Sequence, residues 1–180
     1  RMQSEDGLHT PEQFLLAAER YGQIAAVDRF VLNQLLTQLR NLPSRLPLLV
    51  AFNLSARNLV DNDFISEMLA RLRQQDFPCT QLCVELTETA AIAQLAQARR
   101  GMARLRQLGL ALVLDDFGSG YSSYQYLKHL PVDVVKVDGA FIRDIARAPE
   151  DLALARSINE IAHLLGKRTV AEHVEDEATL

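Results

Sequence analysis

Short apolar runs alternate with amphipathic segments along this chain, and the alternation predicts strands separated by helices. The apolar runs, each expected to form a strand, lie at residues 48–52, 82–84, 110–114, 132–135 and 169–171. The segments around them predict helices over residues 10–21, 24–40, 63–74, 91–108, 122–129 and 150–165. Strands that are apolar throughout and alternate with helices are typical of βαβ units. The pattern therefore predicts an α/β fold with a parallel sheet.

Local signals support the first two helices. Thr10 followed by Pro11 is a helix start, with Gln13 at the capping-box position. Gly22 is expected to end this first helix. One face of the second helix is predicted to consist of Val27, Phe30, Val31, Gln34 and Leu35.

The composition is that of a single globular domain over residues 1–180. Of the 180 residues, 48% are hydrophobic and 23% are charged, which is usual for such a domain. The 23 Asp and Glu residues outnumber the 19 Lys and Arg residues. This balance argues against a nucleic-acid polymer as partner, because binding to a phosphate backbone needs a basic face. The acidic charge balance is compatible with a small phosphate ligand that is held through metal ions.

Few sequence features bear on the cellular location of the protein, and those that do favour the cytoplasm. No apolar run approaches the roughly 18 residues of a membrane span. The polar, acidic segment at residues 1–6 is unlike a signal peptide. Cys79 and Cys83 have no partner cysteines or histidines at zinc-site spacing. We interpret both as free thiols in a reducing compartment.

Polar residues follow each apolar run, at the carboxyl end of the predicted strand. In parallel α/β folds these ends converge on one face, where sites are built. The residues expected to gather there are Asn53, Glu85, Asp115, Asp116, Lys136, Asp138 and Glu172.

Five carboxylates gathered in one place repel each other unless cations are present. Their oxygens are hard ligands that suit Mg²⁺, Mn²⁺ or Ca²⁺. The adjacent Asp115 and Asp116 suit a two-metal site, which is a known device for phosphodiester cleavage. Lys136 could orient an attacking water or offset phosphate charge. The alternative for any single acid is that it only caps the following helix.

The segment over residues 116–123 contains two glycines and three serine hydroxyls. It suits either a phosphate or lid site at a helix start, or a plain helix-entry turn. Its Asp116-Phe117-Gly118 triplet does not indicate a kinase, because neither the glycine-rich loop nor the His-Arg-Asp loop of kinases is present.

Several motifs together resemble the EAL domain family of bacterial cyclic di-GMP phosphodiesterases, and the likeness covers nearly the whole chain. The motifs are Asn53-Leu54-Ser55, Glu85-Leu86-Thr87-Glu88, the segment 115–123, the segment 127–133, Val135-Lys136-Val137-Asp138 and the segment 171–175.

This resemblance implies a TIM-like (β/α)₈ barrel whose strand ends form the active site. Asn53, Glu85 and Asp115 match ligands of a first divalent metal. Asp115 also matches a bridging ligand, and Asp116 and Glu172 match ligands around the second metal. The family's catalytic positions correspond to Lys136, near the attacking water, with Glu172 and Asp116. Arg1 and Asp138 match substrate-binding positions.

A loop anchor is also implied by the resemblance. Glu88 matches the acid that anchors the loop from Phe117 to Ser123, which includes Gly118, Ser119 and Gly120. The family ties this loop to dimerisation and metal binding.

The implied reaction is hydrolysis of one phosphodiester of cyclic di-GMP to linear pGpG, with Mg²⁺ or Mn²⁺ as cofactor and Ca²⁺ as inhibitor. The resemblance further implies a homodimer, attached sensor or GGDEF domains, and a parent chain that is cytoplasmic or membrane-anchored.

The chain departs from the family pattern in three places. The Glu-Ala-Leu motif, which supplies one more metal ligand, is absent before Arg1, and Leu180 precedes the family's last strand. We therefore expect a domain truncated at both ends, with about five of eight strands, that is inactive as an isolated chain. The third departure is His173, which stands where the family usually has Gly; we expect it to be tolerated.

Two other functions stay open at this stage. A degenerate EAL domain would bind cyclic di-GMP as a receptor or act through protein contacts without catalysis. A lyase or aldolase would use Lys136 as a Schiff-base amine.

Overall fold

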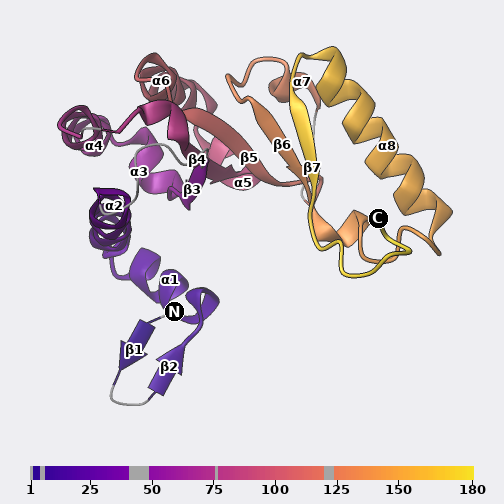
Figure 1. Ribbon diagram of the computed structural model, residues 1–180, viewed down its shortest axis with the longest axis horizontal. Coiled ribbons are helices and arrows are strands. Elements are labelled where there is room, and N and C mark those ends of the chain that lie inside the picture. The colour runs from indigo at the N-terminus through magenta and orange to yellow at the C-terminus, as the bar shows by residue number, and fades with distance from the viewer. Residues whose placement is uncertain (1, 5–6, 41–48, 76, 120–123) are drawn as a thin grey trace.

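The computed structural model describes residues 2–4, 7–40, 49–75, 77–119 and 124–180, and it shows an α/β fold built on a parallel sheet (Figure 1). The sheet has five strands in the spatial order β3-β4-β5-β6-β7, so each strand pairs in parallel with the next along the chain. Their bounds are β3 (Val50–Asn53), β4 (Leu82–Thr87), β5 (Ala111–Phe117), β6 (Val134–Val137) and β7 (Arg168–Ala171). The predicted parallel sheet is confirmed.

Helices precede β3 and connect the five strands of the sheet, as the hydrophobic pattern predicted. They are α1 (Pro11–Arg20), α2 (Ile24–Arg40), α3 (Ala56–Val60), α4 (Asn62–Arg73), α5 (Glu88–Ala93), α6 (Leu95–Gln107), α7 (Tyr124–Leu127) and α8 (Pro149–Leu164), with short 3₁₀ turns η1 (Cys79–Gln81) and η2 (Gly139–Phe141).

Three local features were not predicted. The strands β1 (Met2–Ser4) and β2 (Gly7–His9) form an antiparallel hairpin before α1. The short helix α3 follows β3 directly, capped by the Ser55 hydroxyl. The single helix expected over residues 91–108 is two helices, α5 and α6, because the chain leaves helical geometry at Gln94.

The main core lies between the helices and one face of the sheet. Alternate strand residues such as Val84, Leu86, Leu112 and Leu114 are fully buried there, against helix residues that include Met102. Each such side chain contributes roughly 1.5–3 kcal/mol by leaving water. The opposite face carries a small cluster of Cys83, Val113 and Val134.

The buried face of α2 differs from the predicted one. Ile24, Leu32, Leu36 and Leu39 are buried, whereas the Phe30 residue is 63% exposed. Of the expected face of Val27, Phe30, Val31, Gln34 and Leu35, Leu35 is partly buried against the core, whereas Phe30, Val31 and Gln34 are exposed, so the prediction is wrong for those three. The leucines repeat at helical spacing and make a continuous stripe toward the core, which outweighs the single aromatic ring.

Cys79 and Cys83 are both free thiols, as expected. Among the described residues, no helix has the length and apolar character needed to cross a membrane.

Candidate functional site

The register of the first three sheet strands brings acidic residues to one face. Asn53, the last residue of β3, lies directly opposite Glu85 of β4. Glu85 pairs with Val113, and Asp115 lies two residues further along β5. Because side chains alternate along a strand, Asn53, Glu85 and Asp115 project from the same face of the sheet.

The same register extends through the last two strands. Val134 pairs with Val113, and Lys136 lies two residues further along β6. Lys136 in turn pairs with Val170, two residues before Glu172. Lys136 and Glu172 therefore share the face of the acids on β4 and β5, at the carboxyl ends of the strands.

Lys136 lies among three carboxylates. Its ammonium nitrogen Nζ is 2.7 Å from Asp115 Oδ1, 2.7 Å from Glu172 Oε1 and 3.8 Å from Glu85 Oε2. These side chains are only 14% to 19% exposed, so the surrounding water screens their charges weakly. The predicted meeting of Glu85, Asp115, Lys136 and Glu172 is observed.

Asp116 reaches the same cluster by a local break in the strand. Simple alternation would send it to the face opposite Asp115. Instead the pairing of β5 with β6 shifts register between Leu114 and Phe117, and Asp116 has a left-handed φ of 54°. Such irregularities re-aim side chains. One carboxylate oxygen each from Asp115, Asp116 and Glu172 lies within 4.8 Å of the others.

The electrostatics of the cluster follow from this crowding. Burial raises the pKa of Glu85, and the charges of Asp115 and Glu172 raise it further against the opposing effect of Lys136. Burial and the neighbouring carboxylates, Asp115 first, also raise the pKa of Asp116. Burial alone would lower the pKa of Lys136, but its hydrogen bonds to Asp115 and Glu172 outweigh burial and raise it.

The donor set fits a divalent cation. It consists of carboxylate oxygens, with the amide of Asn53 at the neighbouring strand end, and these are the ligands that Mg²⁺ and Mn²⁺ prefer. The sheet face also borders a cavity of about 350 Å³, whose lining includes Glu85 and Lys136.

Glu88, the first residue of α5, contacts the start of the loop that follows β5. The residue is 3% exposed, and its carboxylate accepts hydrogen bonds from the Gly118 N–H at 2.8 Å and from the Tyr126 hydroxyl. The loop start is further held by the Ser119 hydroxyl, which donates to the Asp116 carbonyl at 2.9 Å. Phe117 is fully buried behind it.

Asp138 lies just beyond the end of β6 and caps η2, because its Oδ1 accepts a 2.7 Å hydrogen bond from the Ala140 N–H. Its predicted contact with substrate stays a prediction. Arg1 and Gly120 lie outside the described residues.

Sequence reasoning missed Asp28 on α2, which contacts the segment that follows Asn53. A signal was available. Ile24, Asp28, Leu32 and Leu36 repeat every four residues, so Asp28 is the one carboxylate in the buried stripe of this helix.

Comparison with known proteins gives one family over the full chain. A family model described as EAL domain matches residues 1–180. Cyclic di-GMP phosphodiesterase PdeB of Shewanella oneidensis is 37% identical over 93% of this chain. Cyclic di-GMP phosphodiesterase NbdA of Pseudomonas aeruginosa is 39% identical over 94% of it. The matched segments are 20% and 22% of those two relatives, so the chain spans about a fifth of their length.

Solved structures agree with this match. The PaMucR phosphodiesterase in complex with c-di-GMP is 32% identical, with a TM-score of 0.87 over 99% of this chain and 74% of that chain. An EAL domain protein from Listeria monocytogenes is 26% identical, with a TM-score of 0.85 over 99% of this chain and 70% of that chain. The predicted fold class, an α/β TIM-like barrel, is confirmed by these neighbours.

Proposed function

Because this chain belongs to the EAL domain family, we propose that it provides the active site of a divalent-metal-dependent phosphodiesterase that hydrolyses cyclic di-GMP to linear pGpG. The observation that carries the proposal is the convergence of Glu85, Asp115, Lys136 and Glu172 on one face of the sheet. Relatives that cover almost the whole chain are named cyclic di-GMP phosphodiesterases, which supports this substrate.

The metal ligands in this proposal are the oxygen donors at the strand ends. Asn53, Glu85 and Asp115 would hold one ion, and Asp115, Asp116 and Glu172 would hold a second. The separation of 4.8 Å or less among oxygens of Asp115, Asp116 and Glu172 supports a shared site. The ions are Mg²⁺ or Mn²⁺, with Ca²⁺ inhibitory. Bound there, such ions would supply Lewis-acid polarisation of the phosphate and would make a nearby water more acidic.

The protein's own groups complete the site. Lys136 offers a buried positive charge at the point where negative charge gathers on a phosphate, and it can donate a hydrogen bond to the attacking water. In the overall reaction, a new bond from water oxygen to phosphorus replaces one ester bond to ribose, and the ribose oxygen leaves as a hydroxyl that carries one of the protons of the water. We assign uptake of the proton of the water to Asp116 and Glu172, and the proximity of their carboxylates supports this role. We assign substrate contacts to Arg1 and Asp138.

The loop after β5 belongs to the same proposal. The hydrogen bonds of Glu88 to Gly118 N–H and Tyr126 hydroxyl support its role as the anchor that fixes the residues after Asp116. A homodimer, attached sensor or GGDEF domains, and a cytoplasmic location are further parts of the proposal. Two free cysteines support a reducing compartment.

The test uses the full-length protein that carries these residues, purified and stripped of metal. Cyclic di-GMP is added with Mg²⁺ or Mn²⁺, and linear pGpG is followed by chromatography. The matched controls are Glu85→Ala, which removes a proposed ligand, and Glu160→Ala, which removes an exposed acid on α8 outside the family motifs.

We expect turnover that requires metal, is lost in Glu85→Ala and is retained in Glu160→Ala. Binding of cyclic di-GMP without turnover would overturn the enzymatic proposal and favour a receptor. Turnover that persists after metal removal would overturn the metal site.

A further inference from the structure

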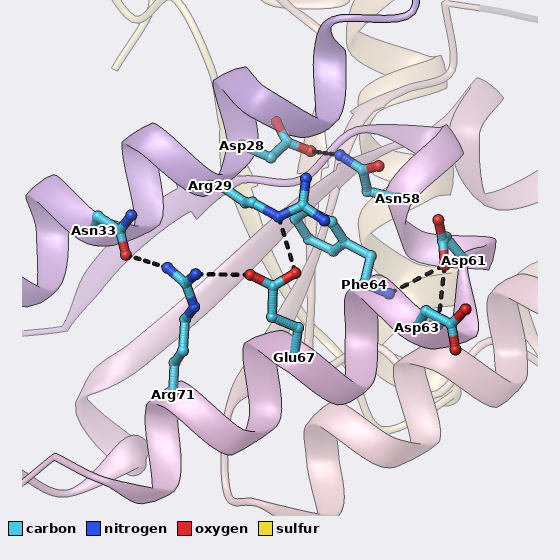
Figure 2. Close-up of polar contacts among 9 residues, drawn as sticks. All are labelled: Asp28, Arg29, Asn33, Asn58, Asp61, Asp63, Phe64, Glu67 and Arg71. Atoms are coloured by element: carbon cyan, nitrogen blue, oxygen red, sulfur yellow. Dashed lines mark hydrogen bonds and ion pairs between the residues drawn. The ribbon is translucent and has the colours of Figure 1, made fainter.

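A single oxygen of Asp28 accepts three hydrogen bonds. The donors to Oδ2 are the backbone N–H of Ser55 at 3.0 Å, the hydroxyl of Ser55 at 2.7 Å and the side-chain amide of Asn58 at 2.7 Å. Asn58 is 1% exposed, so its amide depends on protein partners for its hydrogen bonds. Asp28 thus ties helix α2 to the start of α3 (Figure 2).

The segment held by Asp28 begins two residues after Asn53. On the other side, the backbone N–H of Leu54 donates to the carbonyl oxygen of Glu85 at 3.0 Å. Two consecutive N–H groups after Asn53 are therefore fixed, one by β4 and one by α2. The position of the Asn53 backbone follows from these two attachments, because the peptide units between them are planar and short.

From this geometry we infer that Asp28 is a positioning residue for Asn53, acting through Ser55 to hold the Asn53 amide at the carboxyl edge of the sheet. The inference rests on the proposed function, in which Asn53 is a metal ligand. Asp28 itself lies on a helix and outside the acidic cluster. Its contribution is to the geometry of a ligand and hence to metal affinity.

The neighbouring Arg29 has a different task, which makes it a matched control. Its Nε lies 2.8 Å from Glu67 Oε2 on α4, and its guanidinium lies 5.1 Å from the centre of the Phe64 ring. Figure 2 shows these contacts beside Asp28, on the adjacent residue of the same helix. Arg29→Ala therefore weakens the packing of α2 on α4 and leaves the hydrogen bonds of Asp28 in place.

The experiment measures Mn²⁺ affinity by titration calorimetry on the full-length, metal-stripped protein. The variants are Asp28→Ala, Asp28→Asn, Arg29→Ala, Asn53→Ala and the double variant of Asp28→Ala with Asn53→Ala. Circular dichroism and urea unfolding report on the fold of each. Asp28→Asn keeps an uncharged acceptor oxygen with two lone pairs at the same place, whereas Asp28→Ala leaves three donors without that acceptor.

We expect Asp28→Ala to weaken Mn²⁺ binding about tenfold, the lower end of the effect of losing a partner that orients a ligand. Asp28→Asn should restore most of the affinity, and Arg29→Ala should bind Mn²⁺ as the wild type does. In the Asn53→Ala background, Asp28→Ala should have no further effect on Mn²⁺ affinity, since Asp28 acts through Asn53.

Three results would overturn the inference. Unchanged Mn²⁺ affinity in Asp28→Ala would do so while leaving the proposed function intact, and so would an equal loss of affinity in Arg29→Ala, which would mark a general effect of helix packing. Absence of Mn²⁺ binding by the wild type would instead remove the metal site and this inference with it.

Discussion

Lys136 and Asp115 face each other across strands β6 and β5, with Nζ 2.7 Å from Oδ1. The same ammonium bonds Glu172, so one cation balances carboxylates from two other strand ends. Removal of this cation would leave like charges close together in a largely buried cluster.

Lys136→Met should therefore destabilise the metal-free protein by about 1–3 kcal/mol and reduce turnover of cyclic di-GMP by about 10²-fold or more. Urea unfolding and the chromatographic assay measure these two effects. The control is Lys128→Met, the same substitution at an exposed lysine, and it should change neither stability nor turnover. A Lys136→Met protein as stable as the wild type would show that the carboxylates do not need this cation.

Glu88 carries a second prediction, because its buried carboxylate accepts from both the Gly118 N–H and the Tyr126 hydroxyl. Glu88→Ala should lower the free energy of unfolding by about 1–3 kcal/mol through the loss of that buried acceptor. Tyr126→Phe removes only one donor and should cost less. Urea unfolding of both variants tests the order; a larger loss in Tyr126→Phe would contradict the anchoring role.

His173 and Gly139 are predicted to depend on each other. A Cβ atom added to Gly139 would overlap the imidazole of His173, and His173 itself has a left-handed φ of 53°. Gly139→Ala should therefore destabilise the protein by about 1–3 kcal/mol. His173→Gly should rescue it, because glycine removes the ring and adopts positive φ without strain. Additive losses in a double-mutant cycle of unfolding free energies would rule out this contact.

The sequence was informative about the sheet and the place of the site because both depend on simple periodicities. Apolar strands that alternate with amphipathic helices predict a parallel sheet, and the carboxyl ends of parallel strands meet at one edge. Glu85, Asp115, Lys136 and Glu172 could therefore be grouped from their positions after the apolar runs alone. The ion pairs of Lys136 agree with that grouping.

Other features depend on contacts that no local pattern encodes. Asp116 joins the cluster only through the register shift and positive φ in β5, against the alternation expected of a strand. The exposure of Phe30 follows from how α2 docks on the core. A buried face predicted from hydrophobicity alone did not include that docking. Asp28 meets Ser55 across 27 positions in the chain, so only the folded structure brings them together.

Lys167, the residue that precedes β7, gives a pH-dependent prediction. The residue is 8% exposed, and its ammonium donates to the carbonyl oxygens of Leu130 at 2.9 Å and Val132 at 3.1 Å. Burial lowers the pKa of Lys167 from its ordinary value of 10.5, against the charge of Asp133, which raises it. Between the lowered pKa and 10.5, the folded protein binds fewer protons than the unfolded chain.

In that pH window the free energy of unfolding must gain a contribution that increases with pH. The wild type should therefore gain stability relative to Lys167→Met as the pH rises toward the ordinary lysine pKa of 10.5. Methionine keeps an unbranched apolar side chain and removes the titrating group. Urea unfolding of both proteins across this range measures the difference, and Lys128→Met corrects for the loss of an exposed lysine. If the free energy of unfolding of the wild type, relative to that of Lys167→Met, stays constant or falls with increasing pH, Lys167 keeps its proton in the fold at least as readily as in the unfolded chain.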